Sequence, residues 1–333
     1  MKSAFVNNNP AQVKNVYAPA LLATLAKEAE LSDTVYTKDY VLANKERFAD
    51  TEYIFSTWGM PVFTSDEVKE IFKSLKCVFY GAGTVQAFAR PFIENGVKVF
   101  SAWAANAVPV AEYTVAQIVL ANKGFFAHQR EMKQRNLPVC AEMKKKFLGN
   151  YDLKVGLIGA GMIGSLVAEM LKAYKLEVLV FDPFLAPERA EKLGVKLASL
   201  DEIFSTCNVV SNHLANNAQT QGMLKYSHFS AMPPYSTFIN TGRGAQVVEA
   251  DLIKVLEERP DVTAVLDVTY PEPSVEGYPF YTLPNCFLTS HIAGSLCNET
   301  HRMSEYMYAE YSAYVKGEPT KYEVTMKMLE TMA

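Results

Sequence analysis

Three polar residues in the second half of the sequence directly follow short apolar runs. Arg243 follows the run 236–240, Glu272 follows 263–268, and His291 follows 286–289. In open α/β sheets, ligands bind beyond the carboxyl ends of the strands. If the three runs are parallel strands of one sheet, their side chains meet at one edge and form a candidate reaction centre.

These residue types suit the interconversion of a 2-keto acid and a 2-hydroxy acid. Arg243 offers a planar guanidinium for a carboxylate and a carbonyl oxygen. Hydride addition leaves an alkoxide that must be protonated, and His291 can donate that proton. Glu272 would orient the imidazole and favour its charged form, which raises the histidine pKa. Taken singly, each residue has an ordinary alternative: a solvated charge, a turn residue and a structural histidine.

A glycine-rich element lies upstream. Gly159, Gly161 and Gly164 form the pattern G-x-G-x-x-G between a predicted strand at 154–158 and a predicted helix at 162–173. Gly159 permits a tight turn, Gly161 lets the backbone approach a pyrophosphate, and Gly164 lets helix and strand pack closely. The element therefore predicts a dinucleotide site.

Two further features refine that prediction. The amides of Met162 and Ile163 would point at the phosphates from the positive end of the helix. Asp182 ends the next predicted strand, about 20 residues after the glycines, where a carboxylate bonds the ribose hydroxyls and repels a 2′-phosphate. We therefore expect NAD rather than NADP. The alternative is a glycine-rich turn with an incidental aspartate.

The elements that position these residues alternate along the chain. Strands are predicted at 4–6, 35–36, 53–56, 77–80 and 97–101, and then at 154–158, 178–181, 209–212, 236–240, 263–268 and 286–289. Helical patterns lie between them, for example at 18–28 and 65–74, the latter with Ser65 as N-cap of a capping box. Repeated strand–helix units predict parallel sheets.

Two longer helices complete this outline. One is expected over 107–134, before the second series of strands. The other, over 298–315, has no strand after it, so we expect it to pack back on the first series of elements. Its stripe of Met303, Tyr306, Met307 and Tyr311 has helical spacing and predicts a packing face.

Composition restricts the class of protein. The chain has 333 residues, which predicts two domains, and its net charge of −4 gives no reason to expect nucleic acid or a membrane surface as partner. Five cysteines without C-x-x-C spacing predict reduced thiols in the cytoplasm. We see no signal peptide, no apolar run near the ~18 residues of a spanning helix, and no metal site.

These residues, in this order, resemble the D-isomer-specific 2-hydroxyacid dehydrogenases over nearly the whole chain. The family's catalytic Arg, Glu and His fall on Arg243, Glu272 and His291, and Leu266-Asp267-Val268 precedes Glu272 at the family's spacing. The resemblance implies an α/β protein of two doubly wound parallel-sheet domains with a cleft between them. A Rossmann NAD-binding domain would span 116–297, and a flavodoxin-like substrate domain would combine 1–115 with 298–333.

The resemblance also implies contacts. Asp267 would bind the nicotinamide carboxamide, and the amides around Ala82 and Gly83 would hold the substrate carboxylate. Asn106 matches the segment that enters the interdomain helix, and His213 borders the nicotinamide as a wall residue rather than a second base. The remaining expected cofactor contacts are Thr241, Gly242 and Gly294. Family members are commonly homodimers through the long helix, here 107–134.

The substrate is less well defined by the sequence. Trp58 and Trp103 follow predicted strands, so at least one is expected to line the pocket and favour apolar substrates, with core or dimer packing as the alternative. Departures from the family pattern include Ser290 before the histidine and Gly242 before the arginine. Glu272 argues against a formate dehydrogenase, which has Gln there, and the end of the chain at 333 argues against an appended regulatory domain.

Two other functions stay open. Corepressors of this fold keep the three catalytic residues and act as NAD(H)-sensing binding proteins, although they carry a long disordered tail. An oxidoreductase on a phosphorylated hydroxy acid is the second alternative. Little positive charge lies near Gly83, with Arg90 the nearest candidate, and this disfavours a phosphorylated substrate.

Overall fold

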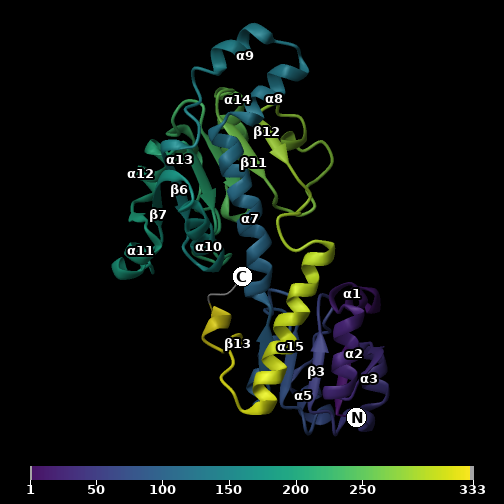
Figure 1. The fold of residues 1–333 in the computed structure, drawn as a ribbon. Helices are drawn as coiled ribbons and strands as arrows, with labels where there is room; N and C mark the ends of the chain where they lie inside the picture. The colour runs from purple at the N-terminus through teal and green to yellow at the C-terminus, as the bar shows by residue number, and fades with distance from the viewer. Residues whose placement is uncertain (1, 331–333) are drawn as a thin grey trace. The chain divides into compact units, whose positions relative to one another are not determined.

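The computed structural model describes residues 2–330, which form two compact units (Figure 1). Ala107–Gly294 make up the second unit, and the chain on either side of it makes up the first. The predicted boundaries, at 115/116 and 297/298, fall slightly further along the chain. The first of them lies inside helix α7 (Trp103–Asn122), whose continuous apolar sequence carries no signal of a junction.

The first unit is built on a parallel sheet with one antiparallel edge strand. Its strands are β1 (Ser3–Val6), β2 (Leu31–Tyr36), β3 (Tyr53–Ser56), β4 (Cys77–Tyr80), β5 (Lys98–Ser101) and β13 (Glu323–Val324). They lie in the order β13-β5-β4-β3-β1-β2, so the parallel strands follow the flavodoxin-like order. The expectation that no strand follows the last helix was wrong, because a two-residue strand such as β13 has no periodic pattern.

Helices flank this sheet. They are α1 (Pro10–Val16), α2 (Pro19–Glu28), α3 (Lys38–Ala43), α4 (Lys45–Phe48), α5 (Ser65–Ile71), α6 (Ala89–Glu94) and α15 (His301–Lys316). Helix α5 begins one residue earlier than its predicted cap implied. The hydroxyl oxygen of Thr64, not that of Ser65, accepts the N–H of Glu67, and the Glu67 carboxylate in turn accepts the N–H of Thr64.

A row of stacked aromatic rings crosses the first sheet. Phe55, Phe79 and Phe100 are register partners on β3, β4 and β5, with successive ring centroids 5.2 and 5.1 Å apart. Tyr311 of α15 meets Phe79 edge to face at 5.7 Å. Tyr311 and Met303 are buried, so α15 packs on the first sheet through the face that the sequence predicts.

The second unit is built on an entirely parallel sheet. Its strands are β6 (Tyr151–Ile158), β7 (Lys175–Phe181), β8 (Lys196–Leu197), β9 (Val209–Asn212), β10 (Thr237–Asn240), β11 (Thr263–Leu266) and β12 (Cys286–Leu288). The order is β12-β11-β10-β9-β6-β7-β8, which is the strand order of dinucleotide-binding domains. The chain reverses direction across the sheet between β6 and β9, and ligands bind at such a switch point. Only β8, which is very short, was not predicted.

Both faces of the second sheet are covered by helices. Besides α7 these are α8 (Phe125–Lys133), α10 (Met162–Leu171), α11 (Pro187–Leu193), α12 (Leu200–Thr206), α13 (Tyr226–Ser230) and α14 (Glu249–Glu258), whereas α9 (Leu137–Met143) contacts α8. Ile118 of α7 and Val167 of α10 pack on one face, and Phe204 of α12 and Leu252 of α14 pack on the other. The strands are therefore buried on both sides, which explains their continuous apolar sequences.

Helix α7 differs from its prediction in two ways. The helix expected over 107–134 is interrupted at Gly124, which has a φ of +67° and where a Cβ would overlap the ring of Phe147. Contrary to expectation, α7 is also long and apolar enough to cross a membrane by length and composition, with a mean hydropathy of 1.2. Half of it is buried inside the protein, as in the core helix of a globular domain.

Candidate active site

The glycine-rich element forms the turn between β6 and α10. Gly159 has a φ of +97°, and a Cβ there would lie 2.7 Å from the carbonyl oxygen of His213. A Cβ at Gly164 would overlap the carbonyl oxygen of Gly159. By contrast, a Cβ at Gly161 would meet nothing within 4 Å. Two glycines are thus needed by the turn itself, whereas the third leaves open space beside the backbone.

That open space lies at the start of α10. Gly161 is the N-cap residue and makes no side-chain capping bond, so the first amides of the helix, including those of Met162 and Ile163, lack a capping partner. Exposed amides at a helix N-terminus attract anions. The residues present therefore fit a pyrophosphate.

Asp182 lies at the end of β7, beside the glycine turn. One of its carboxylate oxygens accepts the N–H of Ala160 at 2.7 Å, and the other accepts the N–H of Phe184 at 2.8 Å. These bonds fix the carboxylate, and each oxygen retains a free lone pair for a further donor. The fixed carboxylate can therefore accept hydrogen bonds from two hydroxyls of a ribose.

The loops after β9 and β10 are joined by an amide network that the sequence did not reveal. The fully buried Gln246 accepts bonds from the Asn212 side chain at 2.6 Å and the Arg243 N–H at 3.1 Å, and donates to the Leu214 carbonyl at 2.7 Å. Gln246 thus fixes the loop after β9 to the loop after β10. The one sign of this role in the sequence is that Gln246 lies three residues after Arg243, within reach of its backbone N–H.

His213 lies in the loop after β9 and is not a proton donor at neutral pH. Its Nε2 lies 2.9 Å from the Ser211 hydroxyl, and its Nδ1 is buried without a hydrogen-bond partner among the described residues. Burial lowers the pKa of the ring to about 4. The neutral ring is consistent with the predicted role of a wall residue.

Arg243 follows β10, and its guanidinium forms no ion pair with a carboxylate among the described residues. The guanidinium donates to the carbonyl of Gly242 at 2.7 Å. The arginine therefore presents an uncompensated positive charge for a ligand anion.

Thr241, which the sequence also assigns to the cofactor, lies with its hydroxyl 3.3 Å from that of Thr114.

Glu272 and His291 form a direct pair. Oε1 of Glu272 lies 2.7 Å from Nδ1 of His291, and both side chains are partly exposed. The pair follows β11, which adjoins β10, and β12, which lies next to β11 at the edge of the sheet. The structure thus brings two of the three predicted catalytic residues into contact and places the third at the same sheet edge.

Asp267 anchors the loop that carries His291. This buried carboxylate accepts the Thr289 hydroxyl at 2.6 Å and the N–H groups of Ile292 and Ala293, each at 2.8 Å. Sequence reasoning missed this structural role, because loop amides carry no sequence signal. The nicotinamide contact expected of Asp267 and the cofactor contact expected of Gly294 stay predictions.

The remaining predicted site residues belong to the first unit. Ala82 is fully buried, and Gly83 beside it has open space where a Cβ would stand. Trp58 and Trp103 are half-buried against the first core, and Trp103 meets Tyr322 edge to face at 5.6 Å. The side-chain oxygen of Asn106 accepts the Ser295 N–H at 3.0 Å, so it holds the returning chain. Their substrate contacts stay predictions.

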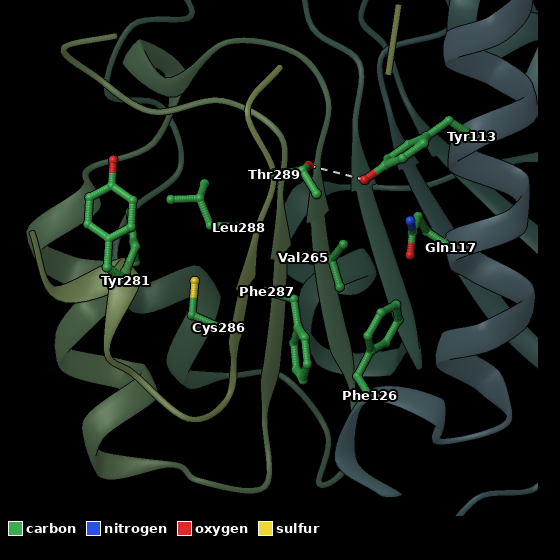
Figure 2. Close-up of a pocket in the computed structure, with 10 residues that line it drawn as sticks. Tyr113, Gln117, Phe126, Val265, Tyr281, Cys286, Phe287, Leu288 and Thr289 are labelled. Carbon is green, nitrogen blue, oxygen red and sulfur yellow. Dashed lines mark hydrogen bonds between the residues drawn. The ribbon is translucent and has the colours of Figure 1, made fainter. Parts of the chain in front are cut away.

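A cavity of about 430 Å³ lies in the second unit beside β12, and Thr289, the hydrogen-bond partner of Asp267, is among the residues that line it. Figure 2 shows Tyr113 of α7 pointing its hydroxyl at Thr289, with Phe126 and Phe287 nearby. Arg243, Glu272 and His291 are absent from its lining. Among residues 2–330, no cluster of His, Cys, Asp and Glu could hold a metal ion.

Comparison with known proteins identifies the family to which the site belongs. Residues 115–293 match the family model described as D-isomer specific 2-hydroxyacid dehydrogenase, NAD binding domain. A D-3-phosphoglycerate dehydrogenase of Archaeoglobus fulgidus is 29% identical over 268 residues, which are 79% of this chain and 50% of the relative. The putative 2-hydroxyacid dehydrogenase YoaD of Bacillus subtilis is 32% identical over 61% of this chain and 59% of its own. The chain spans about half the length of these curated relatives.

Solved structures show the same fold along nearly the whole chain. The D-mandelate dehydrogenase of Rhodotorula graminis matches with a TM-score of 0.80 at 19% identity, over 97% of both chains. A D-isomer specific 2-hydroxyacid dehydrogenase of Lactobacillus delbrueckii, in an NAD-complexed form, matches with a TM-score of 0.76 at 21% identity, over 98% of this chain and 100% of that one. The predicted fold and the predicted NAD cofactor are thereby confirmed. Because the family model covers more than half of the sequence, this chain belongs to the D-isomer specific 2-hydroxyacid dehydrogenase family.

Proposed function

We propose that this protein is an NAD-dependent oxidoreductase that interconverts a 2-keto acid and a D-2-hydroxy acid. The observation that carries the proposal is the Glu272–His291 pair at 2.7 Å, whose residues follow β11 and β12, the next two strands beyond β10, which precedes the unpaired Arg243. A proton donor, a carboxylate that orients it and a free guanidinium are the groups that this reaction requires.

Each residue has a defined task in this proposal. NADH, when bound, supplies the hydride to the carbonyl carbon. Arg243 binds the carboxylate and the carbonyl oxygen of the keto acid by paired hydrogen bonds. His291 donates the proton on Nε2 to that oxygen, while Glu272 accepts the Nδ1–H and fixes the ring. In the opposite direction, His291 takes the hydroxyl proton.

We further propose that the substrate is an unphosphorylated keto acid with apolar surface. The named relatives include D-3-phosphoglycerate dehydrogenases, which makes a phosphorylated substrate the second candidate. However, the chain after β3 contains Trp58 and no Lys or Arg before Lys69, and the chain after β4 contains none before Arg90. The absence of such cations from these two segments disfavours a phosphorylated substrate, because Lys and Arg make the strongest hydrogen bonds to phosphate.

The test is oxidation of NADH and NADPH by purified protein with glyoxylate, pyruvate, hydroxypyruvate, phenylpyruvate and a phosphorylated keto acid. We expect turnover with NADH, highest with an apolar keto acid, and its loss in His291→Ala. Reverse assays with D- and L-hydroxy acids test the stereochemistry. Tight NADH binding without turnover on any keto acid would instead indicate an NAD(H)-sensing protein.

The variants Trp58→Ala and Trp103→Ala test the substrate pocket separately. An unchanged substrate profile in both variants would refute the pocket role of the tryptophans.

We also propose that the protein is a cytoplasmic homodimer. Apolar side chains of α8 and α9 are exposed, namely Phe125, Met132, Leu137 and Val139, and a second copy of the chain is a suitable partner for such a surface. All five cysteines are free thiols, which suits a reducing compartment. Light scattering after size-exclusion chromatography tests the first point, and cell fractionation tests the second.

A further inference from the structure

The side chain of Glu249 holds both ends of the segment that carries Glu272. Glu249 is the first residue of α14 and is buried. One of its carboxylate oxygens accepts the N–H of Tyr270 at 2.9 Å, and the other accepts the hydroxyl of Tyr278 at 2.6 Å. Glu272 lies between these two tyrosines in the sequence, so one carboxylate closes the loop at both sides of it.

The same segment is packed against the loop of Arg243. Gly244 follows Arg243 and begins a short 3-10 turn, Gly244–Gln246, that leads to Glu249. A Cβ at Gly244 would lie 2.6 Å from the backbone nitrogen of Tyr270. The backbones at Gly244 and Tyr270 are therefore in contact. Glu249, a few residues after Gly244, stabilises this contact by accepting the N–H of Tyr270.

The Glu249–Tyr278 contact is not a solvated surface pair. Burial raises the pKa of Glu249, while the bonds from Tyr278 and Tyr270 act in the opposite direction. Burial and the neighbouring Glu249 raise the pKa of Tyr278, so its hydroxyl remains a donor. A buried carboxylate without a cation costs stability unless its oxygens are hydrogen-bonded, and here both are bonded to the Glu272 segment.

We propose that Glu249 and Tyr278 are positioning residues for the reaction, an inference that rests on the proposed function. They set the loop 270–278 so that the Glu272 carboxylate meets Nδ1 of His291 while Arg243 keeps its place at the adjacent strand end. Both act through Glu272 rather than on the substrate or the cofactor.

The same helix supplies matched controls. Asp251, also in the first turn of α14, accepts the N–H of Tyr226 at 2.8 Å, and the Tyr226 hydroxyl donates to Glu258 at 2.8 Å. These are the same kinds of bond, but they hold α13 instead of the Glu272 segment. Glu249→Ala and Tyr278→Phe are therefore compared with Asp251→Ala and Tyr226→Phe.

Steady-state kinetics with NADH and the best keto acid provide the first measurement. We expect Glu249→Ala to lower kcat by about 10- to 100-fold, the loss typical of a small misplacement of catalytic groups, with little change in the KM for NADH. Glu249→Gln restores most of it, because the amide oxygen can accept from Tyr270 and the amide nitrogen can donate to the Tyr278 oxygen. The two control variants keep the wild-type kcat.

Hydrogen exchange gives a second measurement that needs no turnover. Amides of 270–278 should exchange faster in Glu249→Ala and Tyr278→Phe than in the wild type, and unchanged in Asp251→Ala. A wild type without turnover refutes the proposed function, whereas exchange still reports the anchoring. An active wild type with unaltered kcat and exchange in Tyr278→Phe, together with wild-type kcat in any folded Glu249→Ala, overturns the positioning inference.

Discussion

His291 is held by Glu272 through its ring and by its own backbone at the same time. Its Nδ1 lies 2.7 Å from Oε1 of Glu272, and its φ of +60° lies in the left-handed region that few non-glycine residues occupy. The amides of the two following residues donate to Asp267. The direction of the imidazole is therefore fixed by two carboxylates, one buried and one at the surface.

The first prediction separates proton transfer from cofactor binding. His291→Ala should lower kcat by about 10²- to 10⁴-fold, the usual contribution of a general acid. Glu272→Gln should have a smaller effect of the same kind, since the imidazole remains. Both variants should bind NADH like the wild type in a fluorescence titration. Weakened NADH binding of the same size in both would show that the residues serve the cofactor instead.

A second prediction distinguishes the glycines of the turn. Gly164→Ala should lower the melting temperature and weaken NADH binding, because its Cβ would overlap the Gly159 carbonyl. Gly161→Ala should leave the melting temperature unchanged, since nothing lies within 4 Å of the new atom, yet weaken NADH binding. Thermal melts with and without NADH measure both effects. Wild-type NADH affinity in Gly161→Ala would contradict the proposed approach of the pyrophosphate.

Asp182 provides a third prediction, on the choice of cofactor. Asp182→Ala should lower kcat/KM for NADH by about 10- to 100-fold, which corresponds to the loss of hydrogen bonds to a charged group. It should lower kcat/KM for NADPH less, because the repulsion of a 2′-phosphate also disappears. Equal losses for both cofactors would mean that Asp182 supports only the glycine turn through its bond to Ala160.

A fourth prediction concerns the pH dependence of the free energy of unfolding, to which His213 contributes. Its pKa is about 4 in the folded protein against an ordinary 6.5, so the unfolded chain takes up the proton first as the pH falls. The free energy of unfolding therefore contains the full contribution of the neutral ring above pH 6.5. It falls by about 3 kcal/mol at most as the pH falls towards 4. Urea midpoints of the wild type and His213→Gln between pH 4 and 8 should converge at low pH. Parallel curves would mean that folding does not lower the pKa of His213.

The strand runs and the glycine motif were predictable because each has a local physical cause. Continuous apolar runs mark strands buried on both faces, and the context of Gly159, Gly161 and Gly164 allowed few interpretations. Strand ends then placed Glu272 and His291 at one edge of the sheet. Where the cause is tertiary, prediction failed: β13 forms because β5 offers it an edge, and α7 ends where Phe147 crosses Gly124.

The supporting residues of the site were hidden for a related reason. Asp267, Gln246 and Glu249 act mainly on backbone amides of distant loops. A side chain that binds a backbone leaves no mark on the residue it binds, so no motif records the pair. Sequence patterns identified the groups suited to the chemistry and missed the groups that hold them.

The closure of the first sheet by α15 and β13 has a consequence for protein synthesis. On the ribosome, the stacked rings of Phe55, Phe79 and Phe100 emerge before the second unit, but Tyr311, which covers Phe79, emerges only after it. The second unit is one continuous segment and can fold before the first is complete. The nascent chain must therefore carry an uncovered aromatic sheet while the whole second unit is synthesised, and this is a stage at which it is prone to aggregate or to need a chaperone.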